Sequence, residues 1–244
     1  MSNTGCRKRR DVRIAIDGPA GAGKSTLARR LARELGIKYI DTGAMYRALT
    51  LKALQEGIDP SNEDMVAALA ETVSIDLKRP LEDGGEQLVF LDGTDVTSLI
   101  RSPAVNRNVS LVAMHPRVRE AMVEAQRRLA SGSVVMEGRD IGTKVLPEAE
   151  VKIFLTADFA ERVRRRCREL ASRGYVPDVH EVEAEVAMRD RIDSERETDP
   201  LRPAEDSFLL DSSGMTADEV AGAVLGLCEE RIGCSTGSSA RWRA

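Results

Sequence analysis

The chain has 244 residues, a length that accommodates one large domain or a core domain with inserted lobes. Its hydrophobic fraction of 42% and charged fraction of 31% are typical of a soluble globular protein. The net charge of −4 argues against a general nucleic-acid binder, which would carry a basic surplus. No apolar run approaches the ~20 residues that a membrane-spanning helix needs.

Both ends of the chain, residues 1–11 and 233–244, are expected to be disordered extensions. The first is basic but lacks the apolar stretch of a secretory signal, and the second is rich in glycine and serine. The cysteines show no C-x-x-C spacing, so neither a zinc site nor a disulfide framework is expected. This usage indicates a reducing, cytoplasmic location, and we expect a monomer that binds small molecules rather than nucleic acid or a membrane.

The first part of the chain alternates short apolar strands with helices. Residues 12–16 (VRIAI) predict a buried strand, and residues 24–35 predict a helix that Gly36 ends. A second strand over 38–41 and a helix over about 44–56 follow. Ser61, with Asp64 three residues later, predicts the N-cap of a further helix toward Glu71.

Residues 72–99 have a different texture, with apolar and polar residues in alternation and turn signals at Asp83-Gly84-Gly85 and Asp92-Gly93. This pattern predicts a small β-meander or hairpin inserted between helical segments.

The second half returns to alternating elements. We expect helices over about 116–129, 160–174, 182–197 and 217–231, and strands over 134–137, 151–155 and 207–213. Because short apolar strands alternate with helices throughout, the core should be a parallel sheet with helices on both faces.

The turn between the first strand and the first helix carries the clearest chemical signal. Residues 18–25 match G-x-x-x-x-G-K-[ST] in full, with a strand before and a helix after. Backbone N–H groups of such a turn cradle phosphates, the lysine reaches the β- and γ-phosphates, and the hydroxyl is offered to Mg²⁺. The sequence therefore predicts a nucleoside triphosphate site formed by Gly18, Pro19, Ala20, Gly21, Ala22, Gly23, Lys24, Ser25 and Thr26.

Arginine is abundant in the second half, and a phosphoryl transfer between two anions needs several cations. On the helix over 160–174 we expect Arg162, Arg164 and Arg168 to be solvated, and leave Arg165 and Arg166 open. Better candidates are Arg189, Asp193 and Arg196, whose spacings of four and three place them on one helical face.

Several stretches together resemble a known family. "IDGPAGAGKST", "YIDTGAMYRA", "PRVREAM", "EGRDIGT", "VKIFLTA", "RDRIDSERETDPLRPA" and "LLDSSGMTADEV" are similar, in order, to bacterial-type cytidylate kinase over about residues 12–231.

The resemblance implies a P-loop nucleoside monophosphate kinase fold over residues 12–232, with a parallel sheet flanked by helices. It implies a monophosphate-binding region over about 41–131, including the β-rich insert at 72–99, and a short lid over about 158–200. The implied reaction transfers the γ-phosphoryl group of ATP to CMP or dCMP with Mg²⁺.

The resemblance also implies residue roles. Thr42, Tyr46 and Arg47 would lie in the acceptor site, and Ser110, Arg119 and Asp140 would face the cytosine, with Arg139 nearby. Asp193 would bind the sugar hydroxyl, while Arg189 and Arg196 would hold the acceptor phosphate and act with Lys24 in catalysis. Arg165 would belong to the lid or the ATP side. Glu137 stands where some members have aspartate, so its metal or water role is open, and Ser25, a glycine in some members, is the candidate metal contact.

The chemistry of the base fits these residues. Cytosine presents its amino group as a donor and N3 and O2 as acceptors, so an acceptor such as Asp140 or Ser110 with a donor such as Arg119 suits it and rejects uracil. Two alternatives remain: a kinase for another small molecule, such as shikimate, gluconate or a different monophosphate, and a nucleotide-binding switch that is not an enzyme.

Overall fold

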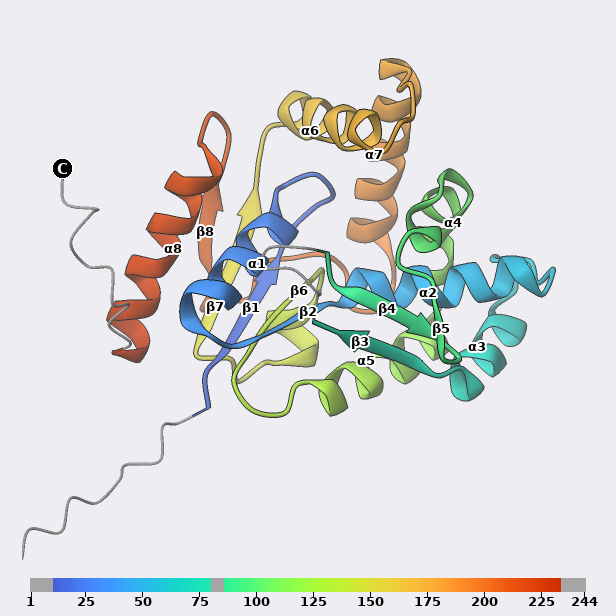
Figure 1. The fold of residues 1–244 in the computed structure, drawn as a ribbon, viewed down its shortest axis with the longest axis horizontal. Coiled ribbons are helices and arrows are strands. Elements are labelled where there is room, and N and C mark those ends of the chain that lie inside the picture. Colours follow the sequence, from blue (N-terminus) through green and yellow to red (C-terminus); the bar gives the residue numbers. More distant parts are fainter. Residues whose placement is uncertain (1–10, 80–85, 234–244) are drawn as a thin grey trace, which may run out of the picture.

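A five-stranded parallel sheet forms the centre of the computed structural model, which describes residues 11–79 and 86–233 (Figure 1). The strand order is β2 (Lys38–Asp41), β6 (Val134–Gly138), β1 (Arg13–Asp17), β7 (Val151–Thr156) and β8 (Phe208–Asp211). In register, Ile14 pairs with Val135 on one side and with Val151 on the other. The central strands are almost wholly buried, as expected for a parallel sheet covered on both faces.

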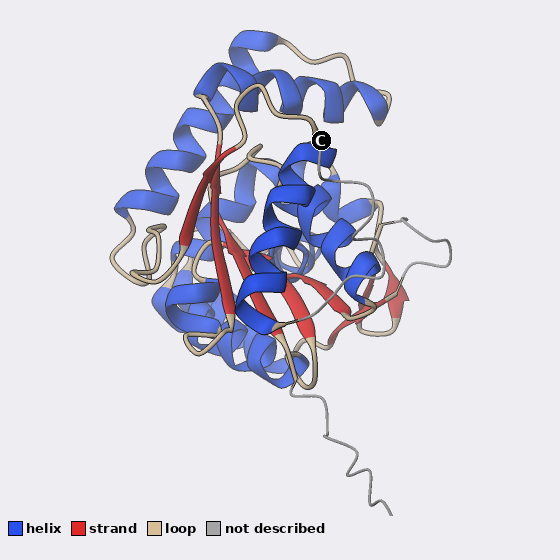
Figure 2. Cartoon of the chain, turned by 90° about the vertical axis from the view of Figure 1, so that its left-hand side faces the viewer, coloured by secondary structure: helices blue, strands red, loops and turns tan. Residues whose placement is uncertain are grey.

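Helices cover both faces of this sheet, which confirms the predicted fold class (Figure 2). On one face, α1 (Lys24–Leu35) and α8 (Ala217–Ile232) share an apolar core with the sheet, for example Leu31 and Val224 against Ile153. On the other, α5 (Pro116–Leu129) and a five-residue π-helical turn, η2 (Ile141–Val145), pack against β1, β2 and β6. The carboxyl ends of the strands therefore form one edge, where parallel sheets bind ligands.

A second layer extends from the β2 edge. It contains α2 (Thr42–Gln55), α3 (Glu63–Thr72), α4 (Pro103–Met114), which follows a 3₁₀ turn η1 (Leu99–Arg101), and a three-stranded antiparallel sheet of β3 (Ile75–Lys78), β4 (Leu88–Leu91) and β5 (Thr94–Asp95). This small sheet occupies the stretch expected to be β-rich. The boundaries proposed for the monophosphate-binding region and the lid stay predictions.

One side chain ties the small sheet to the large one. The Gln87 side chain, just before β4, accepts a hydrogen bond from Asp41 N at 2.9 Å through Oε1 and donates to Tyr39 O at 2.6 Å through Nε2. Both bonds run to the backbone of β2, which is an edge strand of the central sheet.

The helices α6 (Phe159–Ser172) and α7 (Val179–Glu195) form a pair above the strand ends, at the top of Figure 1. They pack through Val163, Val182 and Val186. The spacing predicts that Arg189, Asp193 and Arg196 share one helical face. This is wrong for Arg196, because α7 ends at Glu195 and Arg196 is its C-cap residue.

Several expected bounds are corrected by local capping. Asn62, not Ser61, caps α3, accepting from Met65 N at 3.2 Å, and α2 begins at Thr42 because Asp41 accepts from Ala44 N. Helix α4 was missed, although Ser102 caps it and a proline occupies its first turn. The bounds of α1 and α5 are as predicted. The expected extensions fall almost wholly on residues 1–10 and 234–244, which lie outside the described residues.

Candidate active site

The phosphate-binding turn joins β1 to α1 in the way the sequence predicts. Gly18 has no room for a side chain, because a Cβ there would lie 1.9 Å from Leu155 O. Gly21 has φ of +77°, and a Cβ would lie 2.9 Å from Arg162 O. The backbone can therefore curl over β7 and α6 into the first turn of α1, where unpaired N–H groups and the helix dipole favour an anion.

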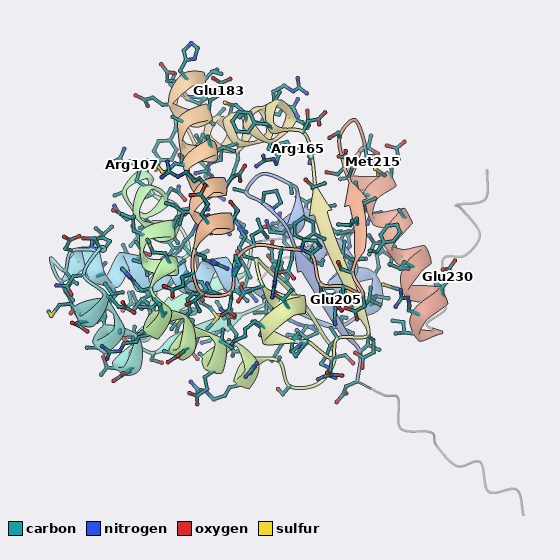
Figure 3. The ribbon with its side chains drawn as sticks, turned by 180° about the vertical axis from the view of Figure 1, so that it is seen from behind. Arg107, Arg165, Glu183, Glu205, Met215 and Glu230 are labelled. Atoms are coloured by element: carbon teal, nitrogen blue, oxygen red, sulfur yellow. The ribbon has the colours of Figure 1, made fainter. Side chains whose placement is uncertain are left out.

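Two arginines of α6 support the turn from behind. Arg162 donates to Ala20 O at 3.2 Å and pairs with Asp190 at 2.7 Å; it is only 7% exposed, so the prediction that it is solvated is wrong. Arg165, labelled in Figure 3, donates to Ala22 O at 3.0 Å and to Ser212 O at 2.9 Å. Arg164 is exposed as expected. The turn is thus clamped between α6 and the loop after β8.

Lys24 lies at the meeting point of the turn and the cavity beside it. Its Nζ donates to Pro19 O at 2.8 Å, and the residue is buried. Burial and the nearby Arg139 lower the pKa of Lys24 to about 7, against the opposing pull of Glu137 and Asp193. A phosphate beside this amine would restore its charge.

Glu137 lies near the end of β6, beside Lys24. Tyr39 Oη donates to its carboxylate at 2.6 Å, and Thr42 Oγ1 donates to its backbone carbonyl at 2.7 Å. Burial raises the pKa of Glu137, as does Asp41, while Lys24 and a hydrogen bond from Ser25 lower it. A carboxylate and a hydroxyl therefore face the same space as the lysine.

A cavity of about 160 Å³ opens from Lys24 toward α2, α4, α5 and α7. Every residue that the sequence assigned to the acceptor site lines it: Thr42, Tyr46, Arg47, Ser110, Arg119, Arg139, Asp140, Arg189, Asp193 and Arg196. An adjoining cavity of about 310 Å³ is lined by Gly21, Gly23, Lys24, Ser25, Thr26 and Arg165. The structure thus brings the acceptor residues together and places Lys24 and Ser25 between the two spaces.

The acceptor cavity also contains Arg101, which the sequence did not single out, and Arg166, which it left open. Arg101, from the 3₁₀ turn after the small sheet, and Arg166, from α6, line both cavities. Arg101, Arg166 and Arg189 each have a buried Nε without a hydrogen-bond partner among the described residues. Burial and the neighbouring Arg189 and Arg101 lower the pKa of Arg47 to about 9. So concentrated a positive charge, with buried donors left over, suits phosphate groups.

No sequence signal distinguishes Arg101, since it follows the insert in an irregular stretch. Arg166 could be found only by knowing which face of α6 is covered. Its guanidinium contacts Glu169 at 2.9 Å and Glu185 at 3.3 Å.

At the far end of the cavity, Arg119 and Asp140 form a buried pair. Arg119 is 1% exposed, donates to an Asp140 carboxylate oxygen and to Ala113 O, and lies with its guanidinium carbon 5.9 Å from the centre of the Tyr46 ring. Arg139, which the resemblance placed near the base, donates to Asp193 at 2.7 Å. The donor and the acceptor suited to a base therefore come from α5 and the loop after β6.

Asp193 and Arg196 complete the wall. Although burial raises the pKa of Asp193, the adjacent Arg139, Arg189 and Arg196 lower it overall. Arg196 donates to Asp199 O at 2.9 Å through Nε and lies 3.8 Å from Asp140. Asp193 is thus a buried carboxylate held between arginines in the wall of the cavity.

Within the described residues, no helix is long and apolar enough to cross a membrane. The same part of the chain holds no group of three or more His, Cys, Asp or Glu side chains arranged to bind a metal ion. Ser25 and Glu137 nevertheless supply hard oxygen donors beside the phosphate turn. That suits Mg²⁺, which binds proteins through one or two carboxylates and keeps water and substrate phosphates as its other ligands.

Comparison with known proteins agrees with this geometry. The family model described as cytidylate kinase matches residues 14–230. A cytidylate kinase from Pelotomaculum thermopropionicum is 58% identical over 85% of this chain and 91% of its own length. One from Geobacillus thermodenitrificans is 55% identical over 92% of this chain and 99% of its own.

A solved structure of an uncharacterized protein from Eubacterium ventriosum shares the fold, with a TM-score of 0.50 and 15% identity over 91% of this chain and all of that one. The region matched by the family model, residues 14–230, includes every residue that lines the two cavities. On the sequence relatives and the family model, the chain belongs to the cytidylate kinase family.

Proposed function

We propose that the protein transfers the γ-phosphoryl group of ATP to CMP or dCMP, giving ADP and CDP or dCDP. Family membership supports this reaction. The observation that carries it is a set of buried arginine Nε groups, around a cavity that opens beside Lys24, that make no hydrogen bond within the described residues. Such donors are expensive to bury unless an anion meets them, and the acceptor monophosphate and the transferred group are such anions.

The residue roles follow from position. Lys24 lies between the two cavities and would follow the phosphoryl group from ATP to the acceptor. Arg47, Arg189 and Arg196 would hold the acceptor phosphate. The transfer needs no covalent intermediate, so positioning and charge neutralisation by these groups would supply most of the catalysis.

The base is read at the other end. Arg119 and Asp140 would present a donor and an acceptor to the cytosine edge, with Ser110 of α4 beside them and the Tyr46 ring beneath. Asp193 would accept from a sugar hydroxyl, and Thr42 would close the cavity at the β6 end. Uracil reverses the pattern at positions 3 and 4 and would meet like polarity.

On the ATP side, the backbone from Gly18 to Thr26 would wrap the phosphates, with Arg165 holding that backbone in place. Mg²⁺ would supply further neutralisation on the phosphates, held by Ser25 and Glu137 through oxygen donors. A cytoplasmic location and a monomeric state remain predictions of the sequence, and light scattering of the purified protein measures the second.

A coupled assay of ADP release tests the function, with CMP, dCMP, UMP and AMP as acceptors and a control without acceptor. We expect turnover with CMP and dCMP, much less with UMP and AMP, and slow ATP hydrolysis when no acceptor is present. Turnover with another acceptor alone would assign a different kinase activity. ATP binding with no acceptor-dependent turnover would favour a nucleotide-binding switch.

A further inference from the structure

Asp17 is a buried carboxylate that the proposed reaction does not use. It is the last residue of β1 and directly precedes Gly18 of the phosphate-binding turn, with 4% of its surface exposed. Its Oδ1 accepts from Ile141 N and its Oδ2 accepts from Gly142 N, both at 2.7 Å. Burial raises the pKa of Asp17 to about 6, against the lowering effect of these two donors.

The two amides that Asp17 holds follow directly after the residues of the acceptor site. Arg139 and Asp140 come between β6 and the π-helical turn η2, so the position of Ile141 and Gly142 decides where these side chains begin. On its other side, the Asp140 carbonyl accepts from Lys144 N at 2.8 Å, which closes the turn. The peptide group between Asp140 and Ile141 is therefore held on both sides, by Lys144 N at its carbonyl and by Asp17 at its N–H, and the next peptide group is held by Asp17.

The contact is tight as well as polar. A Cβ on Gly142 would lie 3.3 Å from Asp17 Oδ2 and 3.3 Å from Lys152 Cδ, so the backbone passes close to the side chains of β1 and β7. Asp17 also lies opposite Gly138 in the register of β1 with β6. The β1–turn junction and the loop that carries Asp140 are thus packed against each other without slack.

We propose that Asp17 is a positioning residue that joins the ATP-binding turn to the base-reading loop, fixing the backbone that aims Asp140 at Arg119 and the acceptor base. The inference rests on the proposed function, which assigns base reading to Asp140. One side chain then connects the binding site of the donor nucleotide to that of the acceptor. Asp17 itself touches neither substrate.

The chain offers a matched pair of substitutions. In Asp17, each carboxylate oxygen accepts one N–H, so Asp17→Asn would turn an amide NH₂ toward a backbone N–H. In Asp178, the N-cap of α7, the same oxygen Oδ1 accepts from His180 N at 2.8 Å and from Glu181 N at 3.2 Å. Asparagine therefore replaces Asp178 without loss but cannot replace Asp17.

At pH 8, where Asp17 is ionised, we expect Asp17→Asn to raise the KM for CMP ~10-fold or more and to lower the CMP-to-UMP preference by a similar factor. The KM for ATP should change less than ~3-fold, because the turn is held separately by Arg162 and Arg165. Asp178→Asn should change none of these. A purely structural role would lower the active fraction and the Tm but leave the CMP KM and the preference intact, and that result would overturn the proposal.

Amide hydrogen exchange at Ile141 and Gly142 tests the same contact without any reaction. We expect strong protection in the wild type and a loss of ~10-fold or more in Asp17→Asn, with the β6 amides unchanged. If the wild type does not phosphorylate CMP, the proposed function fails while this readout still judges the contact. Unchanged protection in Asp17→Asn would overturn the proposal.

Gly142→Ala reaches the contact from the other side and serves if Asp17→Asn does not fold. Its methyl group would press on Asp17 Oδ2 by a few tenths of an ångström. We expect the same CMP-specific rise in KM, of ~3-fold or more. Equal effects on the CMP and ATP KM values, or none on either, would contradict the inference.

Discussion

The two halves of the active site are built in opposite ways. On the donor side, the phosphate-binding turn is one continuous stretch, Gly18 to Thr26, whose shape follows from glycines, one strand and one helix. The acceptor side is assembled from α2, α4, α5, the loop after β6, α6 and α7, which are distant in sequence. The donor side centres on one lysine with a depressed pKa, whereas the acceptor side gathers many arginines with donors to spare.

The difference teaches what each construction demands. A continuous turn needs only local conformation, so a short motif carries it. An assembled pocket needs the whole fold to bring its charges within a few ångströms, and each charge must be balanced by neighbours such as Glu169 and Glu185 or by substrate. Substitutions on the two sides should therefore fail differently.

Lys24→Ala should show the largest effect. It removes the cation that both cavities share, and we expect a loss of ~100-fold or more in kcat/KM, about 2.7 kcal/mol of transition-state stabilisation, in a protein that still folds. The coupled assay with CMP measures it, and Arg164→Ala, an exposed neighbour on α6, is the control. Near-normal turnover of folded Lys24→Ala would remove the lysine from the mechanism.

A comparison of Arg189→Ala with Arg191→Ala tests whether the buried arginines act on the acceptor and not on ATP. Both residues lie on α7, but Arg189 is 9% exposed and faces the cavity, whereas Arg191 pairs with Glu195 on the surface. We expect Arg189→Ala to lower kcat/KM for CMP ~30-fold, with little change in ATP affinity, and Arg191→Ala to have almost no effect. Equal effects of the two substitutions would break the comparison.

Asp140→Ala sharpens the acceptor side further by separating base from phosphate. Loss of the acceptor that pairs with Arg119 should cost CMP ~1–3 kcal/mol, roughly 5- to 150-fold in kcat/KM, while UMP loses little. Competition between CMP and UMP measures the ratio directly. An equal loss for both acceptors would mean that Asp140 supports the pocket without reading the base.

Proton uptake on ATP binding is the smallest of these effects and belongs to the donor side. With a pKa of about 7, the free Lys24 amine is mostly neutral at pH 8, and bound phosphates should restore its charge. We therefore expect uptake of roughly one proton per site at pH 8 and clearly less at pH 6. Calorimetry in buffers of different ionisation enthalpy measures it, and uptake that persists in Lys24→Ala would assign the proton elsewhere.

The sign for folding follows from the same shift. Because the pKa of Lys24 lies below its usual 10.5 in the folded chain, the unfolded chain binds more protons between about pH 7 and pH 10.5. The free-energy cost of burying this lysine should therefore be at its maximum below pH 7. The cost should decrease, and the free energy of unfolding rise, as the pH increases through this window.

The contrast between the two sides also decides what the sequence could predict. The phosphate turn and α1 were predictable to the residue, because glycine, strand and helix signals all act locally. The parallel sheet followed from apolar runs alternating with helices. The acceptor residues came from family resemblance, since their spacing alone says nothing about a shared cavity.

The misses have physical causes. Arg162 was expected in solvent because a crowded basic helix does not reveal which face is covered, yet it contacts Ala20 of the turn. Arg101 was missed because its place in the cavity depends on elements that meet only in the folded chain. Helix α4 was missed even though Ser102 and Pro103 are a standard helix start, because three valines and two asparagines among its twelve residues lower its helix propensity.

The hold of Gln87 on Tyr39 and Asp41 has a consequence for how the molecule behaves among its copies. An edge strand such as β2 displays unpaired N–H and C=O groups, and these can recruit a strand from another chain. Gln87 meets one group of each kind with its side-chain amide, so it stands in for a neighbouring strand without extending the sheet. By occupying these two groups of β2, Gln87 should hinder the pairing of this edge strand with a strand of another copy. This effect on solubility would be separate from any part that the β-rich insert plays in binding nucleotides.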